Sequence, residues 1–164
     1  MPIASLTTCE AEISEIGTRN AAGHITAASY FQTLDNRNNR ECLARFRAVY
    51  GNEVEPNMCW EAAYFQAHLF ARAMRQSGSD EIDRLLPHLL GSEFDAPQGR
   101  VRIDPTNHHT RLYPRIGRVG DHGQFEIVAE SAAGVDPDPY LVNHAAEAAG
   151  TLISRSVAPG AAGG

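Results

Sequence analysis

The chain has 164 residues, of which 43% are hydrophobic and 21% are charged, and its formal net charge is −6 at pH 7. This length suffices for one compact domain with its own core, and the composition excludes disordered, fibrous and collagen-like classes. The negative charge, with no basic stripe of interleaved aromatic residues, argues against direct binding to DNA, RNA or anionic lipid.

The N-terminal segment is expected to form a compact βαβ unit. Residues 2–6 are an apolar run that predicts a strand. Thr7 and, three residues later, Glu10 have the capping-box pattern of a helix start, and this helix is expected to end near Gly17. Residues 23–28 predict a second strand, which would pair with the first in parallel.

Two longer helices are expected next. Asp35 is the predicted cap of a helix over residues 36–50 that ends at Gly51. The helix after Asn57 is predicted to be the longest and to end near Gly78. Helical spacing predicts buried faces made of Cys42, Leu43, Phe46 and Val49 in the first helix and of Trp60, Ala63, Tyr64, Ala67, Ala71 and Met74 in the second. We therefore expect Trp60 and Tyr64 to be core residues and not ligand contacts.

A third, shorter helix is predicted before the part of the chain in which turns and strands are expected. Ser79 is its expected cap, and Pro87 would bend it before Gly91. Its apolar stripe consists of Ile82, Leu85, Leu86 and Leu89.

The last part of the chain predicts turns and strands. Turn signals at 96–99 and 104–107 flank a strand signal at 101–103. Residues 112–119 and 124–130 alternate around a glycine-bounded turn at 120–123, which indicates an antiparallel hairpin. Residues 145–164 are rich in alanine and glycine and are expected to be a disordered tail.

Histidines suggest a metal site, which the sequence pattern does not favour. The candidate ligands are His108, His109 and His122, with Asp104 nearby. Adjacent histidines point in different directions, and no HxH or HExxH motif accompanies them, so we expect no metal. The chain also lacks a nucleophile elbow, a phosphate-binding loop and a dinucleotide fingerprint, so we expect neither an enzyme nor a cofactor.

The cysteines and the apolar content bear on the compartment. Cys9, Cys42 and Cys59 are odd in number and have no CxxC spacing, so free thiols are expected in place of disulfides or a catalytic cysteine. Apolar runs fall short of the roughly 20 residues that span a bilayer, and the first residues lack signal-peptide features. The expectation is a cytoplasmic chain without membrane insertion; a leader upstream of Met1 would make it periplasmic.

Thr7 and Thr8 are the candidate ligand-binding residues. They lie where the first strand passes into a helix, at the carboxyl end of a parallel strand, which is where open α/β folds bind ligands. A hydroxyl both donates and accepts a hydrogen bond, which suits a neutral amide with a carbonyl and an NH₂ group. The alternative at this point is that Thr7 only caps the helix.

Several motifs occur in an order that resembles a known family. They are residues 2–12 (PIASLTTCEAE), Tyr30-Phe31 with Asp35, residues 61–64 (EAAY), residues 95–99 (DAPQG), Asn107-His108-His109 with Arg111-Leu112, and residues 137–140 (PDPY). Together they resemble the branched-chain amino-acid-binding family of periplasmic-binding-protein-like I proteins, over residues 2 to about 144. Within it the SLTT form favours the branch of amide sensors that regulate amidase expression.

The resemblance implies a C-terminal portion of a two-lobed, Rossmann-like α/β protein. Residues 1–29 would end the second lobe, residues 30–35 would cross between lobes, and residues 36–144 would complete both. The family holds its ligand between the lobes, and its strand-to-helix turn contributes a threonine, so Thr7 and Thr8 carry over. Cys9 stands where the sensors usually have serine, which affects helix capping.

Two functions are implied by the resemblance. The first is a sensor of acetamide-like amides or urea that releases an RNA-binding antiterminator protein when ligand binds. The second is the substrate-binding component of an ABC transporter for urea, short-chain amides or branched-chain amino acids, with an ABC permease as its partner. An export signal upstream would favour the transporter.

Overall fold

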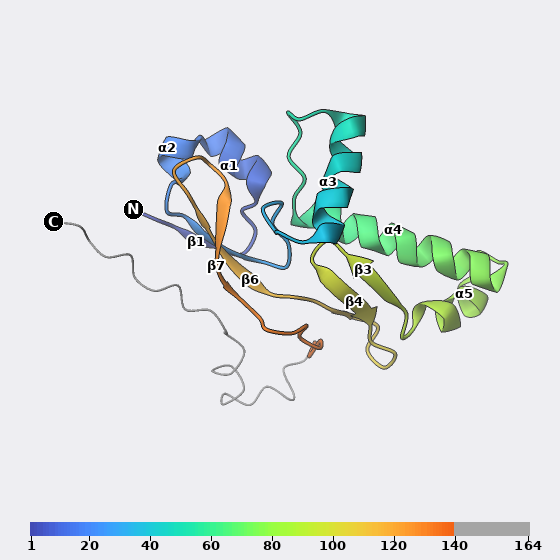
Figure 1. The fold of residues 1–164 in the computed structure, drawn as a ribbon. Coiled ribbons are helices and arrows are strands. Elements are labelled where there is room, and N and C mark those ends of the chain that lie inside the picture. Colours follow the sequence, from blue (N-terminus) through green and yellow to red (C-terminus); the bar gives the residue numbers. More distant parts are fainter. Residues whose placement is uncertain (140–164) are drawn as a thin grey trace.

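The computed structural model describes residues 1–139, in two groups of secondary structure (Figure 1). The first group is a four-stranded sheet in the order β1-β2-β6-β7 with the helices α1 and α2, and the second is a three-stranded sheet in the order β3-β4-β5 with the helices α3, α4 and α5. The predicted α/β class is confirmed. The expected tail at 145–164 lies outside the described residues.

The predicted βαβ unit is confirmed. β1 (Ala4–Ser5) and β2 (Ile25–Ala28) pair in parallel, with Ala4 opposite Ile25. Between them lie α1 (Glu10–Ile16) and α2 (Thr18–Ala21). Gly17 ends α1 with a φ of 81°, a conformation that glycine adopts readily. The short α2 is an addition that the sequence pattern did not predict.

The predicted capping box of Thr7 and Glu10 is wrong, because the helix begins two residues later. The N-cap is Cys9, whose backbone N–H donates a 2.8 Å hydrogen bond to Oε2 of Glu12. Glu10 is instead the first helical residue and is only 3% exposed. The shift arises because the hydroxyl of Ser5 binds the N–H groups that precede the helix.

The predicted hairpin near the end of the described chain is confirmed. β6 (Arg115–Val119) pairs antiparallel with both β2 and β7 (Phe125–Glu130). β6 begins three residues later than predicted, directly after Pro114, which has no N–H to donate to a ladder. The core of this group consists of Ile13, Ala21, Phe31, Val119 and Phe125.

The three predicted helices form the second group with the small sheet. They are α3 (Arg37–Tyr50), α4 (Met58–Ser77) and α5 (Ile82–Leu89), and they are followed by β3 (Glu93–Ala96), β4 (Gly99–Ile103) and β5 (Thr110–Arg111). Gly51 and Gly78 end the first two helices as predicted. The core of this group consists of Phe65, Leu69, Ala96 and Val101.

The expected caps of two helices are wrong. Asn36, not Asp35, caps α3, since its side chain accepts the N–H of Asn39 at 2.9 Å. Asp35 pairs with Arg40 instead. The N-cap of α5 is Glu81, and the hydroxyl of Ser79 accepts the N–H of Glu81 at 3.1 Å, one step before the helix.

The predicted buried faces need correction as well. Val49, which lies on the predicted buried face of α3, is 73% exposed. α4 buries Glu61, Phe65, Leu69 and Ala73, a different face from the predicted one. Trp60 and Tyr64 are half-buried and stack on each other with ring centroids 5.6 Å apart. Ile82 of α5 is 63% exposed, whereas Leu85 is buried.

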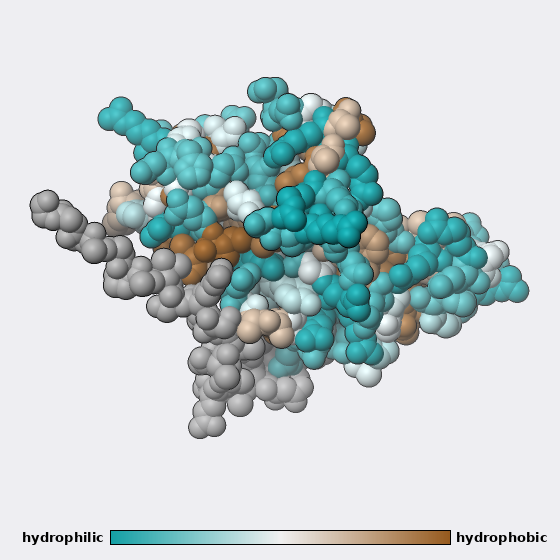
Figure 2. Space-filling model, in the orientation of Figure 1, coloured by the Kyte–Doolittle hydropathy of each residue, from teal (hydrophilic) through white to brown (hydrophobic). Residues whose placement is uncertain are grey.

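The face shown in Figure 2 is mostly hydrophilic. Hydrophobic atoms gather at the end of α3, where Val49, Tyr50 and Val54 are exposed, and over the sheet of the first group. In the part of the chain that the structure describes, no helix combines the length and apolar character needed to cross a bilayer.

Candidate ligand-binding site

The turn between β1 and α1 contains both predicted binding residues. Ser5, the last residue of β1, holds this turn together, because its Oγ accepts hydrogen bonds of 3.1 Å from the N–H groups of Thr7 and Thr8. The hydroxyl of Thr8 also donates to this Oγ at 2.9 Å. Thr7 is exposed and Thr8 is half-buried. The structure therefore brings the two threonines onto one small turn, with the Thr7 side chain facing solvent.

Thr26 on β2 supports this turn from the neighbouring strand. It lies opposite Ser5 in the parallel register and is 1% exposed. Its hydroxyl donates to the carbonyl oxygen of Thr8 at 2.8 Å and lies 3.3 Å from that of Ser5. A β-branched threonine is well suited to a strand, and its single hydroxyl proton is used here to hold the turn.

The backbone donors of the turn are engaged, and the charges beside it are acidic. The N–H groups of Thr7 and Thr8 bind Ser5, and that of Cys9 binds Glu12. Burial and the hydrogen bond with Glu12 raise the pKa of the Cys9 thiol to about 12, and the same contact lowers the pKa of Glu12. The turn thus offers threonine hydroxyls beside a carboxylate, which suits a neutral polar ligand better than an anion.

Residues 29–36 form the first connecting segment between the two groups, and buried polar contacts fix it. The hydroxyl of Tyr30, which is fully buried, donates to Oδ1 of Asn39 at 2.9 Å. The amide of Asn39 in turn donates to the carbonyl oxygens of Gln32 at 2.9 Å and Leu34 at 2.7 Å. One buried asparagine on α3 therefore satisfies the backbone of the segment.

Two further segments connect the two groups, in addition to residues 29–36. Residues 112–114 lead from β5 to β6, and the chain after β7 returns along them. Leu112 and Val135 form an isolated antiparallel bridge, with N–H to carbonyl distances of 3.2 and 2.7 Å. The junction of the two groups consists of these three segments.

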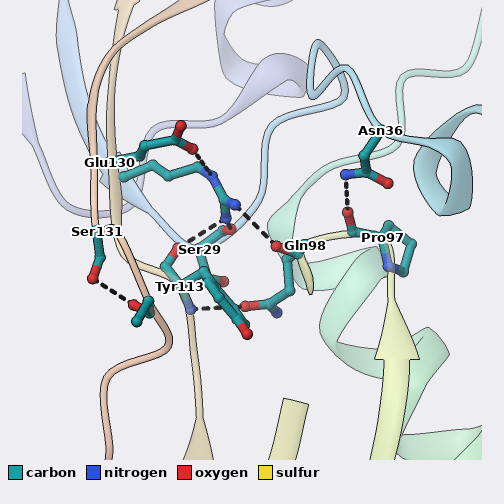
Figure 3. A network of polar contacts seen from close by, with 9 residues as sticks. Ser29, Asn36, Pro97, Gln98, Tyr113, Glu130 and Ser131 are labelled. Carbon is teal, nitrogen blue, oxygen red and sulfur yellow. Dashed lines mark hydrogen bonds and ion pairs between the residues drawn. The ribbon is translucent and has the colours of Figure 1, made fainter. Parts of the chain in front are cut away.

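Arg115, the first residue of β6, lies at the centre of this junction and is 7% exposed. Nη1 donates to the carbonyl oxygens of Ser29 at 2.6 Å and Tyr113 at 2.9 Å, and Nη2 donates to that of Gln98 at 2.9 Å. Nε lies 3.3 Å from Oε2 of Glu130. Figure 3 shows these four partners approaching one point from separate parts of the chain.

Gln98, in the turn between β3 and β4, extends the junction to α4. Its Nε2 donates to Oε2 of Glu61 at 2.7 Å, and its Oε1 accepts the N–H of Tyr113 at 3.2 Å. Glu61 is fully buried, and burial raises its pKa to about 7 although the hydrogen bonds from Gln98 oppose the shift. The buried carboxylate of α4 is thereby connected through Gln98 to Arg115.

A cavity of about 760 Å³ lies at the junction. It is lined by the end of β2 (Ala27, Ala28, Ser29), by α4 (Ala62, Phe65, Gln66), and by Gln98, His108, His109, Thr110, Leu112, Pro114 and residues 135–139. This volume is within the range of sites for small organic molecules. Thr7 and Thr8 are not among the described residues that line it; Thr8 borders a separate cavity of about 10 Å³, which is too small for a ligand.

The structure also places the residues considered for other chemistry. Within residues 1–139 no three His, Cys, Asp or Glu side chains are grouped as metal ligands. His108 has a φ of 63°, and Asp104 binds the backbone of Thr106 and Asn107 in a tight turn. Cys9 and Cys42 are buried, and Cys59 is exposed at the start of α4.

Sequence reasoning missed several residues of the site. Ser5 has a detectable signal, because a serine two and three residues before the threonines is the spacing at which a hydroxyl accepts backbone N–H groups. Thr26, Gln98 and Arg115 have no local signal, since their partners are distant in sequence. Only the fold brings them together.

A family model described as a periplasmic binding protein domain matches residues 1–146. A solved solute-binding protein of an ABC transporter from Rhodopseudomonas palustris, in complex with benzoate, is similar with a TM-score of 0.73 and 18% identity. That similarity covers 84% of this chain and 38% of the other, so it supports the fold alone.

Two curated relatives are also similar. A protein named Leu/Ile/Val-binding protein homolog 6, from Brucella abortus, is 26% identical over 121 residues, which are 72% of this chain and 31% of that protein. A protein named limonene hydroxylase, from Geobacillus stearothermophilus, is 30% identical over 128 residues, which are 78% of this chain and 23% of that protein. The chain therefore spans less than half the length of each relative.

Proposed function

Because the chain belongs to the periplasmic-binding-protein type I family, which includes the branched-chain amino-acid-binding proteins, we propose that it is the C-terminal portion of the solute-binding component of an ABC transporter. Its solute is a small neutral molecule of the amide or urea type. The two groups of elements belong to the two lobes, and the solute binds between them.

The observation that carries this proposal is the junction. Three chain segments connect two separate sheets. Such an arrangement lets two bodies move relative to each other about a defined point, and a solute that binds the closed form better shifts the population toward it.

The neutral character of the solute is supported by the turn after β1. A carboxylate ligand needs a cation or free N–H groups, whereas the N–H groups of Thr7, Thr8 and Cys9 are occupied by side-chain oxygens. Thr7 has an exposed hydroxyl, and Glu12, which accepts the N–H of Cys9 two residues further along the turn, carries a negative charge. An amide would accept a hydrogen bond from Thr7 and donate one to it or to its neighbour.

A second candidate is the amide sensor that regulates amidase expression. The SLTT segment favours it, whereas the similarity to a Leu/Ile/Val-binding protein favours a transporter component. The two functions share the same amide site and differ in partner and compartment. A sensor works in the cytoplasm and releases an RNA-binding antiterminator protein, whereas a transporter component works in the periplasm and delivers its solute to a permease.

The proposed role is binding without turnover. The name of the Geobacillus relative describes that protein, and the match covers 23% of it. Incubation of the protein with acetamide or urea should leave the solute unchanged, as quantified by proton NMR. Release of acetate or ammonia at a rate proportional to protein concentration would instead identify a hydrolase.

A thermal-shift screen tests the proposal. A ligand that binds only the folded state raises the unfolding temperature by mass action. The natural protein that carries this chain should be stabilised in a saturable way by acetamide, butyramide or urea, and less by benzoate or leucine. Stabilisation by benzoate alone would indicate that the solute is an aromatic acid and not a neutral amide. Stabilisation by none of these compounds would reject the amide class.

A further inference from the structure

The buried guanidinium of Arg115 contacts the first two segments that join the two groups of elements, and the end of the strand from which the third segment leaves. Ser29 begins the first segment, Tyr113 lies in the second, and Glu130 ends β7 just before the third. Gln98 adds the turn of the small sheet, which belongs to the second group. In Figure 3 the dashed lines from Ser29, Gln98 and Glu130 meet at this guanidinium.

The chemistry of arginine explains why one side chain makes all these contacts. A guanidinium is planar, stays charged and carries five N–H donors in a fixed fork, so it can hold several carbonyl oxygens at set angles. Desolvation lowers the pKa of Arg115, and the carboxylate of Glu130 opposes this shift. A buried charge is tolerated only when such partners compensate for the lost water, so its position is tightly specified.

We propose that Arg115 is a positioning residue that sets the angle between the two groups. The fork fixes the distance from β6, in the first group, to the Gln98 turn, in the second. It also fixes the position at which the first segment leaves β2 and the position at which the second segment enters β6. Without these bonds the backbone carbonyl oxygens would form hydrogen bonds with water instead. The two groups of elements would then sample a range of relative orientations.

Arg118 provides an internal comparison on the same strand. It pairs with Glu126 of β7 at 3.2 Å, but both side chains are about half exposed, and the pair lies within one sheet. Arg115 also pairs with a glutamate of β7, yet it reaches the second group as well. The difference between these arginines is the connection between groups, which an experiment can isolate.

The inference about the angle stands independently of any ligand, and its consequence for solute affinity rests on the proposed function. In a two-lobed binding protein, the free energy of closing is subtracted from the affinity for the solute. A residue that sets the ligand-free angle therefore tunes affinity without touching the solute.

The angle can be measured between two spin labels in the ligand-free protein. Cys59 is exposed on α4, whereas Cys9 and Cys42 are buried, so Cys59 takes a label selectively. The exposed Glu15 on α1, in the first group, provides the second position as Glu15→Cys. Pulsed electron-electron resonance then gives the distribution of distances between the groups.

The expected result is one narrow distance peak in the parent protein and in Arg118→Met. Arg115→Met should broaden the peak and displace its maximum, and Arg115→Lys should do the same because a single ammonium cannot replace the fork. Circular dichroism at the same temperature must show each variant folded. A purely structural role would lower the unfolding temperature and leave the distances in the folded protein unchanged.

An unchanged distribution in folded Arg115→Met would overturn the proposal. If that variant does not fold, Arg115→Lys decides, and a peak identical to that of the parent then rejects the role of the fork. Because no solute is added, these outcomes are independent of whether amides bind, which the thermal-shift screen determines separately.

Discussion

The backbone N–H of Gln32 donates a 3.0 Å hydrogen bond to Oε1 of Glu10. Glu10 begins α1 and Gln32 belongs to the first connecting segment, so a buried carboxylate of the first group holds the chain that leads to the second. The other oxygen, Oε2, is buried without a hydrogen-bond partner among the described residues. A charge at this position is therefore costly.

Stability is predicted to fall as pH rises from about 5 to about 8. Desolvation is the largest cause that raises the pKa of Glu10 from 4.5 to about 7, and desolvation raises that of Glu61 to about 7 as well. Between these pKa values the folded protein holds protons that the unfolded chain has lost, so rising pH favours unfolding. Each group should contribute about 2–3 kcal/mol across this range, measured by urea unfolding.

Glu10→Gln tests the first of these contributions. An amide keeps an acceptor for the Gln32 N–H and stays neutral, so the variant should lose about half of the pH dependence and be more stable than the parent at about pH 8 by about 1–3 kcal/mol. Glu15→Gln, on the exposed side of α1, is the matched control and should keep the parent slope. An unaltered slope in Glu10→Gln would assign the dependence elsewhere.

The two threonines are predicted to differ in their effect on folding. The Thr7 side chain is exposed, so Thr7→Val should change the free energy of unfolding by less than about 0.5 kcal/mol. The Thr8 hydroxyl donates to Ser5 at 2.9 Å, so Thr8→Val should cost about 1 kcal/mol. Urea unfolding at fixed pH measures both. Equal costs would mean that the Ser5 turn does not depend on Thr8.

The three cysteines are predicted to react at different rates. Cys59 is exposed, whereas Cys9 and Cys42 are buried, and burial raises the pKa of both buried thiols. The thiolate is the reactive form, so a disulfide reagent near pH 8 should modify Cys59 rapidly and the others only on unfolding. Cys59→Ser should abolish the fast phase. Rapid reaction of a second thiol in the native protein would show that Cys9 or Cys42 becomes accessible.

Gly117 of β6 is predicted to tolerate no side chain. A Cβ at this position would lie 2.6 Å from Cζ of Phe31 and 3.0 Å from Cδ1 of Phe125. Because both rings are buried, Gly117→Ala should cost about 1–3 kcal/mol of stability. Phe31→Leu makes room for the added methyl group, so the double variant should lose less stability than the sum of the losses in the two single variants. Strict additivity would mean that the methyl group does not meet Phe31.

The helices and the hairpin were predictable because their signals are local. The α4 boundaries follow from Asn57 and Gly78, and the hairpin follows from alternation around a turn bounded by glycine. The buried face of α4 was not predictable in the same way. It includes Glu61, a charged residue of a type that is rarely fully buried, whose hydrogen-bond partner Gln98 comes from another element.

In the candidate site, too, some features have a local sequence signal and others depend on contacts between distant residues. Thr7 and Thr8 were identified from their place after a strand, and the structure puts them on an exposed turn. Their relation to the junction cavity depends on the packing of distant elements, which no local pattern encodes. The junction itself depends on Arg115, whose partners Ser29 and Gln98 are 86 and 17 residues away in sequence.

Calorimetric titration of the natural protein that carries this chain tests the central claim most directly. Acetamide, butyramide and urea are titrated into the parent, Thr7→Val and Thr8→Val, with leucine and benzoate as comparison ligands that carry a carboxylate. We predict saturable binding of a neutral amide, lost in Thr7→Val although that variant keeps its stability. Binding of leucine or benzoate alone, or amide binding unchanged in both threonine variants, would contradict the account.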